Sequence, residues 1–234
     1  MTYDPHAALQ AIDSNLLPVF TLSALAFVFN AIYFFEAARL GYKHKTYVFP
    51  MWALSFFMIH DISFVLFFDK WFYEYNHVLL KFFWVALVVT TLTEIIFLYQ
   101  YIKYGHKEIS PTISQRFFSC LVLCSLPLSF TVWMIIKSAL MDDLYLIAFA
   151  LTVFWNCPAF TQMIWQRRSR KGQSVLLNIG VVGMQISFNC ALLFVDPYFR
   201  SPLFIGLMIV TILWTLANIG LLFRFPEYRP ENAG

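Results

Sequence analysis

Charged residues are scarce in this chain. They make up 12% of its 234 residues, about half the usual share of a soluble domain, while 60% of the residues are hydrophobic. The four cysteines all lie in apolar stretches, which argues against a disulfide scaffold. The net charge of +3 comes from basic loops, so we expect no surface for nucleic acid. This composition excludes an ordinary soluble domain and is typical of a membrane protein.

Several motifs of catalysis and metal binding are also missing. The chain has no glycine-rich phosphate loop and no serine-nucleophile elbow. His60 has no second His or Cys at ligand spacing on its helix, and Asp142-Asp143 does not continue into an Asp-Asp-x-x-Asp site. The last apolar run contains no Lys, which excludes a retinal Schiff base there. We therefore expect neither a metal nor a cofactor.

Long apolar runs are what the chain has in abundance. A helix rises about 1.5 Å per residue, so about 20 apolar residues cross a hydrocarbon layer of about 30 Å. Backbone groups in lipid must be paired internally, which a helix does by itself. The runs predict an all-α membrane protein with seven transmembrane helices in one domain, residues 1–234. The predicted spans are Leu16–Arg39, Tyr47–Phe68, Val78–Ile102, Ile113–Ile136, Leu144–Trp165, Gln173–Val195 and Pro202–Phe223.

Basic residues predict the orientation of these spans. Twelve of the 16 Lys and Arg residues fall in the loops after the first, third and fifth spans and in the C-terminal tail. The positive-inside rule then predicts a cytosolic C-terminus and an N-terminus outside or in a lumen. The first 15 residues lack Lys and Arg, so we expect the first span itself to serve as the signal. The interpretation is an integral, multi-pass protein, in the endoplasmic reticulum if the cell is eukaryotic.

Short matches relate the first three spans to the last three. Asp61-Ile-Ser-Phe in the second span matches Gln185-Ile-Ser-Phe in the sixth, and Leu-Thr-Glu94-Ile in the third matches Leu-Ala-Asn218-Ile in the seventh. The order is kept, which favours a parallel 3+1+3 repeat of residues 16–102 and 144–223 around a linker helix, 113–136. The alternative is chance matching in Phe- and Leu-rich helices. Repeat interfaces of this kind commonly hold a site near the bilayer midplane.

Polar side chains inside the spans are the candidate functional residues. An ionisable group there costs about 2.5–3.5 kcal/mol and usually faces the bundle interior. Two carboxyl groups that meet in a low dielectric cannot easily both ionise, so one keeps its proton and is a proton donor. Asp61 and Glu94 are therefore the candidate catalytic residues. The candidate substrate-binding residues are His60, Asn30, Asn156, Gln185, Asn218, Phe57 and Phe64.

Phe57 and Phe64 belong to this set because they lie on the helix face of Asp61. Their ring faces would stabilise a cationic intermediate. With 27 Phe in the chain, plain helix packing is the alternative explanation of this stripe.

Loop motifs resemble those of the fungal integral-membrane terpene cyclases of the paxilline and pyripyropene type. Residues 41–50 (GYKHKTYVFP) resemble the charged loop before their second helix, and Lys103-Tyr-Gly resembles the end of their third. Arg168-Ser-Arg-Lys-Gly-Gln-Ser resembles their entry to helix 6, and Ser201-Pro-Leu their entry to helix 7. The resemblance implies a seven-helix enzyme that cyclises prenylated, often epoxidised, substrates by protonation and without a cofactor. The family's acids are a glutamate after tryptophan in helix 2 and an acid in helix 7, where this chain has His60-Asp61 and Asn218.

The expected function is thus acid-catalysed cyclisation of a prenylated or epoxidised isoprenoid, a step of meroterpenoid secondary metabolism. Asp61 would be the general acid, Glu94 would tune it or receive the final proton, and Asn218 would orient the substrate. The expected partners are a lipid-soluble isoprenoid in the membrane and neighbouring biosynthetic enzymes, a prenyltransferase and an epoxidase.

A second resemblance leaves another function open. Pro158-Ala-Phe-Thr-Gln162 with the basic loop after it is similar to the proline-glutamine helix end of the SWEET and PQ-loop transporters, which are also parallel 3+1+3 bundles. This resemblance implies a carrier of a small polar solute. Asn30, Asn156, Gln185 and Asn218 would line its central site, and Asp61 and Glu94 would couple protons. A third alternative is a non-catalytic assembly protein.

Overall fold

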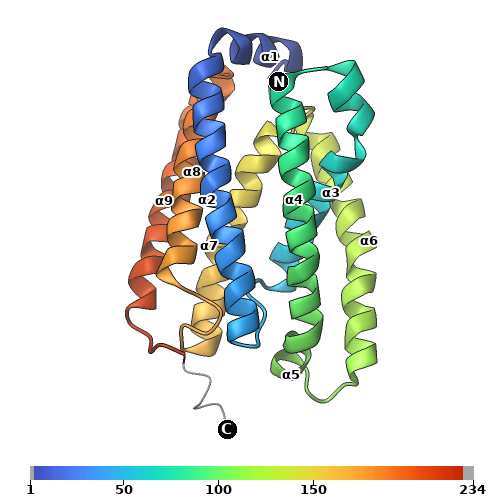
Figure 1. The fold of residues 1–234 in the computed structure, drawn as a ribbon, viewed down its shortest axis with the longest axis vertical. Coiled ribbons are helices and arrows are strands. Elements are labelled where there is room, and N and C mark those ends of the chain that lie inside the picture. Colours follow the sequence, from blue (N-terminus) through green and yellow to red (C-terminus); the bar gives the residue numbers. More distant parts are fainter. Residues whose placement is uncertain (1–2, 229–234) are drawn as a thin grey trace.

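The computed structural model describes residues 3–228, in which helices are the regular secondary structure and no strand occurs (Figure 1). Six helical stretches are long and apolar enough to cross a membrane, which indicates a multi-pass membrane protein. They are α2 (Leu16–Lys43), Val78–Ile109, α6 (Gln115–Leu140), α7 (Leu146–Arg167), α8 (Val175–Leu192) and α9 (Pro202–Leu222). The second stretch comprises α4 (Val78–Gln100), the π-helix η2 (Tyr101–Gly105) and α5 (His106–Ile109).

The remaining apolar helix, α3, is shorter than the span Tyr47–Phe68 predicted from the sequence. It covers Met51–Leu66, 16 residues, and begins after Pro50, whose extended backbone (ψ 150°) forms the N-cap. At its other end the indole of Trp71 donates a hydrogen bond to the Phe64 carbonyl oxygen (2.7 Å), one of the groups that a helix end leaves unpaired. Trp71 lies in the short π-helix η1 (Lys70–Glu74), through which the chain turns back towards α4.

An additional helix, α1 (Pro5–Ser14), was not predicted from the sequence and crosses one end of the bundle (Figure 1). We call this the α1 end. Asp4 caps the helix by accepting from the Ala7 backbone N–H at 2.7 Å. The Tyr3 hydroxyl donates to Asp142 in the turn between α6 and α7 at 2.5 Å, and burial raises the pKa of the Asp142 carboxyl. This contact ties the start of the chain to the α6–α7 turn.

The closest helix pair is α2 with α8, two helices far apart in the sequence (Figure 1). Small residues allow the approach. A Cβ atom at Gly180 would lie 2.9 Å from the Tyr33 backbone nitrogen, and one at Gly183 would lie 2.4 Å from the Phe29 ring. Further contacts join α3 to α4, α6 and α7, and α9 to α7 and α8, while α2 also contacts α4.

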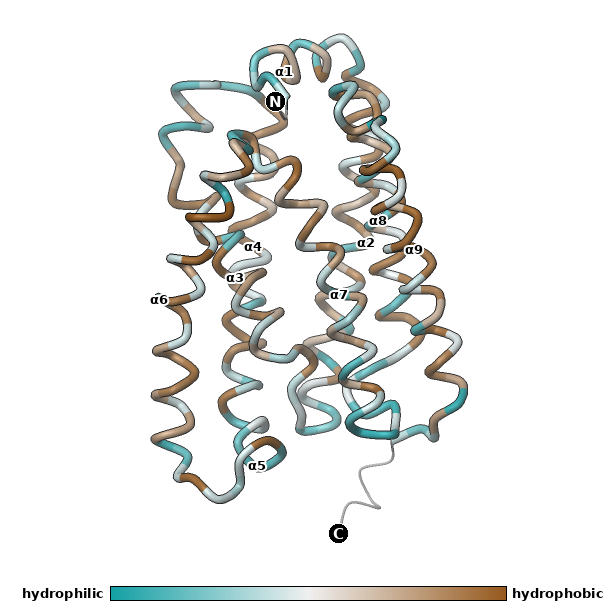
Figure 2. The backbone as a smooth tube through the Cα atoms, turned by 180° about the vertical axis from the view of Figure 1, so that it is seen from behind, coloured by the Kyte–Doolittle hydropathy of each residue, from teal (hydrophilic) through white to brown (hydrophobic). Residues whose placement is uncertain are grey.

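Apolar residues run along the long helices, as the hydropathy colours in Figure 2 show, and many large apolar side chains are exposed. α6 is the extreme case, because only Phe118, Val122 and Trp133 of its 26 residues are buried. Exposed large apolar side chains such as Leu17 and Leu203 continue this surface on α2 and α9. A soluble monomer rarely exposes so much apolar area, whereas lipid tails would cover it.

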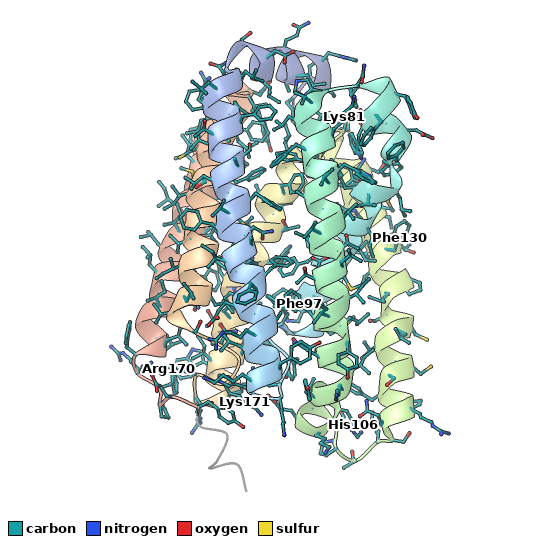
Figure 3. All side chains as sticks on the ribbon, viewed as in Figure 1. Lys81, Phe97, His106, Phe130, Arg170 and Lys171 are labelled. Carbon is teal, nitrogen blue, oxygen red and sulfur yellow. The ribbon has the colours of Figure 1, made fainter. Side chains whose placement is uncertain are left out.

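The end opposite α1 carries the polar contacts between loops, and Figure 3 labels Arg170, Lys171 and His106 there. Arg167 pairs with Glu108 (Nε to Oε1, 2.6 Å) and donates to the Tyr47 carbonyl oxygen (2.9 Å). The backbone N–H of Gly172 donates to His44 Nδ1 at 2.9 Å. We call this the C-terminal end of the bundle. Its contacts join the loop after α2 to the loop before α8.

Candidate functional site

A cavity lies inside the bundle, among α2, α3, α4, α7 and α8, with about 800 Å³ of empty space including the part that opens outward. Eight of its 20 lining residues are aromatic: Phe27, Phe34, Phe57, Phe82, Phe83, Phe149, Phe188 and Tyr33. The polar lining residues are Ser23, Asn30, Asp61, Thr90, Glu94, Thr152 and Asn156. Figure 3 shows how densely side chains fill the space between the helices. The cavity is therefore an apolar chamber with a few polar groups, two of them carboxyl groups.

Asp61 of α3 lines this chamber and is only 7% exposed. Its Oδ1 lies 2.7 Å from His60 Nδ1. Its Oδ2 accepts a hydrogen bond from the hydroxyl of Thr90 on α4, and that hydroxyl also contacts the Leu87 carbonyl oxygen at 3.1 Å. Both carboxyl oxygens of Asp61 are therefore engaged, one within α3 and one across to α4.

Glu94 lies one turn after Thr90 on α4, on the same helix face, and also lines the chamber. It is 1% exposed, and its Oε2 has no hydrogen-bond partner within residues 3–228. Its ionisable neighbours are Asp61 and Tyr33, with which it interacts electrostatically. The chamber thus brings the two candidate catalytic carboxyl groups together, and Thr90 stands between them.

His60 contacts Asp61 through its Nδ1 atom but does not line the chamber. Its ring packs against Trp133, Tyr145 and Phe149 with centroid separations of 5.4, 5.5 and 4.7 Å. Its Nε2 is buried and has no hydrogen-bond partner in the described part of the chain. His60 therefore contacts the acid and an aromatic cluster, and a substrate in the chamber would not touch it.

The structure places three of the other candidates on the chamber wall, namely Asn30, Asn156 and Phe57. The Asn156 Oδ1 accepts from the Tyr33 hydroxyl at 2.7 Å, which fixes the amide against α2. Asn30 makes no hydrogen bond to another described residue and is half-buried. These residues give the chamber two amides and a further aromatic ring.

The structure does not bring Gln185, Asn218 and Phe64 to the chamber. The Gln185 amide donates to Thr215 Oγ1 at 3.0 Å, and Asn218 Oδ1 accepts from Thr161 Oγ1 at 2.6 Å. The Phe64 ring stacks on Trp71 with centroids 4.3 Å apart. These side chains connect neighbouring helices.

Sequence reasoning missed Thr90 and Tyr33, the two hydroxyl groups closest to this chemistry. Helical spacing could have found both of them, because Thr90 precedes Glu94 by four residues and Tyr33 follows Asn30 by three. Within residues 3–228 no group of three His, Cys, Asp or Glu side chains is arranged to hold a metal ion. The chemistry of the chamber therefore has to be argued from its carboxyl, amide, hydroxyl and aromatic groups.

The chain matches no family model, no curated protein and no solved structure in the comparisons made with it. Its fold and site define a class nevertheless: a helical, multi-pass membrane protein with an aromatic internal chamber that holds two carboxyl groups.

Proposed function

We propose that this protein is an integral-membrane terpene cyclase, which cyclises a prenylated or epoxidised isoprenoid by protonating it inside the chamber. The observation that carries the proposal is the presence of Asp61 and Glu94 on a chamber wall that includes seven phenylalanine rings. The loop motifs that resemble those of the fungal cyclases agree with it.

The chemistry of such a reaction fits the lining. Protonation by a positioned acid typically accelerates a reaction by about 10²–10⁴-fold. The carbocation that follows is stabilised by the faces of aromatic rings and destroyed by water, so a ring-lined apolar chamber favours ring closure.

Substrate access also fits a lipid-soluble molecule. On the side of the chamber formed by α2 and α4, the half-buried lining residues are Phe27, Asn30 and Phe34 of α2 and Phe82 of α4. Phe27 and Phe82 meet edge to face across the two helices, with ring centroids 6.0 Å apart. A prenylated substrate would enter from the bilayer between α2 and α4 by displacing these rings.

The same proposal includes seven crossings, with α3 and the η1 turn as the second of them. It also includes a parallel repeat of α2–α4 and α7–α9 with α6 as the linker. Helix contacts support the repeat: α2 contacts α4 as α7 contacts α9, α3 contacts α4 as α8 contacts α9, and α2 contacts α8 as α7 contacts α3. We place the α1 end in a lumen or outside, and the basic C-terminal end in the cytosol.

The substrate's chemistry implies the reactions before this one. A prenyltransferase must attach or build the isoprenoid chain, and an epoxidase must act first if the proton opens an epoxide. In a eukaryotic cell these partners and this protein would share the endoplasmic reticulum membrane.

The test is incubation of membranes containing the protein with farnesylated or geranylgeranylated aromatic substrates and their epoxides. We expect a cyclic isomer of the substrate, and a rate about 10²–10⁴-fold lower with Asp61→Asn. Asp143→Asn, in the α6–α7 turn outside the chamber, is the matched control and should cyclise at the wild-type rate. If Asp61→Asn cyclises as fast as wild type, the proposal is wrong.

A carrier for a small polar solute remains the second candidate, because Asn30 and Asn156 both line the chamber. Against it, Gln185 and Asn218 lie outside the chamber, so half of the expected polar site is absent from the lining. Solute uptake into proteoliposomes with a pH dependence that Glu94→Gln removes would favour the carrier. A function that survives loss of both carboxyl groups would favour an assembly protein.

A further inference from the structure

The two carboxyl groups of the chamber differ in their hydrogen bonds. Asp61 has a partner on each oxygen, His60 Nδ1 at 2.7 Å and the Thr90 hydroxyl. Glu94 has a buried oxygen, Oε2, without any partner in the described residues. This contrast separates the roles that the two acids can take.

The tautomer of His60 follows from its surroundings. Its Nε2 is buried without an acceptor, so a hydrogen on that atom would be an unsatisfied donor, which typically costs about 1–3 kcal/mol. A hydrogen on Nδ1 instead donates to Asp61 Oδ1. Asp61 then receives two hydrogen bonds, from an N–H and from an O–H, which engage both of its carboxyl oxygens.

Glu94 has the opposite environment. It is buried, and it forms no ion pair among residues 3–228. The ionisable groups that face it are Asp61 from α3 and Tyr33 from α2, neither of which supplies positive charge. An isolated buried carboxylate beside a second carboxylate is strongly disfavoured, whereas the neutral acid is tolerated.

We infer that Glu94, and not Asp61, donates the initiating proton, while Asp61, held in place by His60 and Thr90, receives the final one. This inference rests on the proposed cyclase function and reverses the roles expected from the sequence. His60 and Thr90 are positioning residues, because they act on Asp61 and not on substrate.

The reaction balances with these two acids alone. The O–H bond of Glu94 breaks as its proton bonds to an alkene carbon, and the alkene electron pair forms the new C–H bond and leaves a carbocation. For an epoxide the proton bonds to oxygen and the C–O bond breaks. After ring closure, Asp61 takes a proton from carbon, and that C–H pair becomes the product double bond, so substrate and product are isomers.

The proton must then return from Asp61 to Glu94 before the next turnover. The Thr90 hydroxyl touches Asp61 and lies one helical turn before Glu94 on the same helix face, so the proton would return past Thr90 once the Glu94 side chain swings into contact with it. Asp61 lines the chamber, so its carboxylate also lies where it can stabilise the intermediate cation.

Infrared spectroscopy of the purified protein in lipid nanodiscs tests the assignment without substrate. We expect the carbonyl stretching band of a protonated carboxyl group in wild type, its loss in Glu94→Gln and its retention in Asp61→Asn. Asp142→Asn serves as the control, because comparing its spectrum with that of wild type identifies any band that comes from this buried acid at the α1 end. A band that disappears with Asp61→Asn, with both variants or with neither overturns the assignment.

Thr90→Val and Thr90→Ser provide the kinetic readout. Valine removes the hydroxyl, so we expect kcat to fall at least 10-fold with KM nearly unchanged, and serine to restore most of the rate. Equal rates for valine and serine would overturn the positioning role. If the infrared result holds but no isoprenoid is cyclised, the proposed function fails and the donor role fails with it. Cyclisation with the band on Asp61 overturns the donor role alone.

Discussion

In the proposed repeat, the two halves of the bundle carry different chemistry at matching sequence positions. In the half α2–α4, Asp61 and Glu94 line the chamber, and one oxygen of Glu94 has no partner in the described chain. In the half α7–α9, the matching residues are Gln185 and Asn218, whose side-chain amides bond to neighbouring helices. Acids therefore face empty space where amides fill a helix interface.

This difference shows what each half is adapted for. Hydrogen bonds between transmembrane helices contribute only about 0.6 kcal/mol on average, so the amides hold α7, α8 and α9 together at little cost. A buried carboxyl group is more costly and would be replaced by an amide if it served packing alone. Under the proposed function, a substrate, and not a neighbouring helix, supplies the missing partner of this carboxyl group.

The largest effect is expected from moving an acid between the halves. Glu94→Gln should lower the cyclisation rate by about 10²–10⁴-fold, because the amide has no proton to donate. The double variant Glu94→Gln with Asn218→Asp should be as slow, because position 218 faces Thr161 and the Cys157 carbonyl oxygen outside the chamber. Rescue by the second substitution, measured as product formed per minute, would contradict this separation of the halves.

The second prediction concerns the two contacts between the halves. One contact is that of α2 with α8, which Gly180 allows to be close. The other is that of α7 with α3, where the position matching Gly180 is Phe56. The Phe56 ring packs on Trp155 of α7 with centroids 5.9 Å apart. Gly180→Ala should cost about 1–3 kcal/mol, because the new methyl group meets the Tyr33 backbone at 2.9 Å. Gly206→Ala on α9, with nothing within 4 Å, is the control and should not destabilise the protein. Thermal unfolding in detergent measures both, and equal melting temperatures would remove the explanation.

The long helices were predictable because lipid-facing residues leave unbroken apolar runs. The last predicted span, Pro202–Phe223, begins at the same residue as α9 and ends one residue after it. Its start was predictable because Ser201-Pro202 is a recognisable helix start. α1 was missed because apolar length was the criterion, although Asp4-Pro5 carries the same start signal. The predicted span Tyr47–Phe68 was too long at both ends, because composition does not show that Pro50 and Phe67 lie outside the helix.

The site was predictable only in part. The inward direction expected for Asp61 and Glu94 agrees with the chamber, since a carboxyl group has few other places in a membrane. Gln185 and Asn218 show the limit of that reasoning. These helices are apolar nearly all round, so the sequence of one helix does not fix how it is rotated against its neighbours. Whether an amide faces a cavity or a helix depends on that rotation.

A third prediction compares two asparagines, one from each half. Asn218→Leu removes the bonds to Thr161 and the Cys157 carbonyl oxygen, so we expect a loss of about 0.6–1.7 kcal/mol in stability. Asn30→Leu removes no hydrogen bond to a described residue, so it should leave stability unchanged while altering turnover in the chamber. Both quantities should be measured for both variants. We expect Asn218→Leu to lower the melting temperature and Asn30→Leu to change the rate. A larger loss of stability for Asn30→Leu would show that its amide serves packing.

The last prediction concerns the place where the two halves join at the C-terminal end of the bundle, at His44 and Gly172. Burial, with neighbouring Lys43 and Arg39, lowers the pKa of His44 to about 4, and its Nδ1 accepts from the Gly172 N–H at 2.9 Å. The unfolded chain would bind this proton near the ordinary value of about 6.5, so the contribution of His44 to stability is complete above that pH. It should be lost as the pH falls from about 6.5 to about 4. After screening by water, we expect the free energy of unfolding to fall by about 1–2 kcal/mol over that window.

His44→Gln keeps an acceptor without a titrating group, so it should flatten the dependence of melting temperature on pH. An unchanged slope in that variant would mean that the acid sensitivity arises elsewhere.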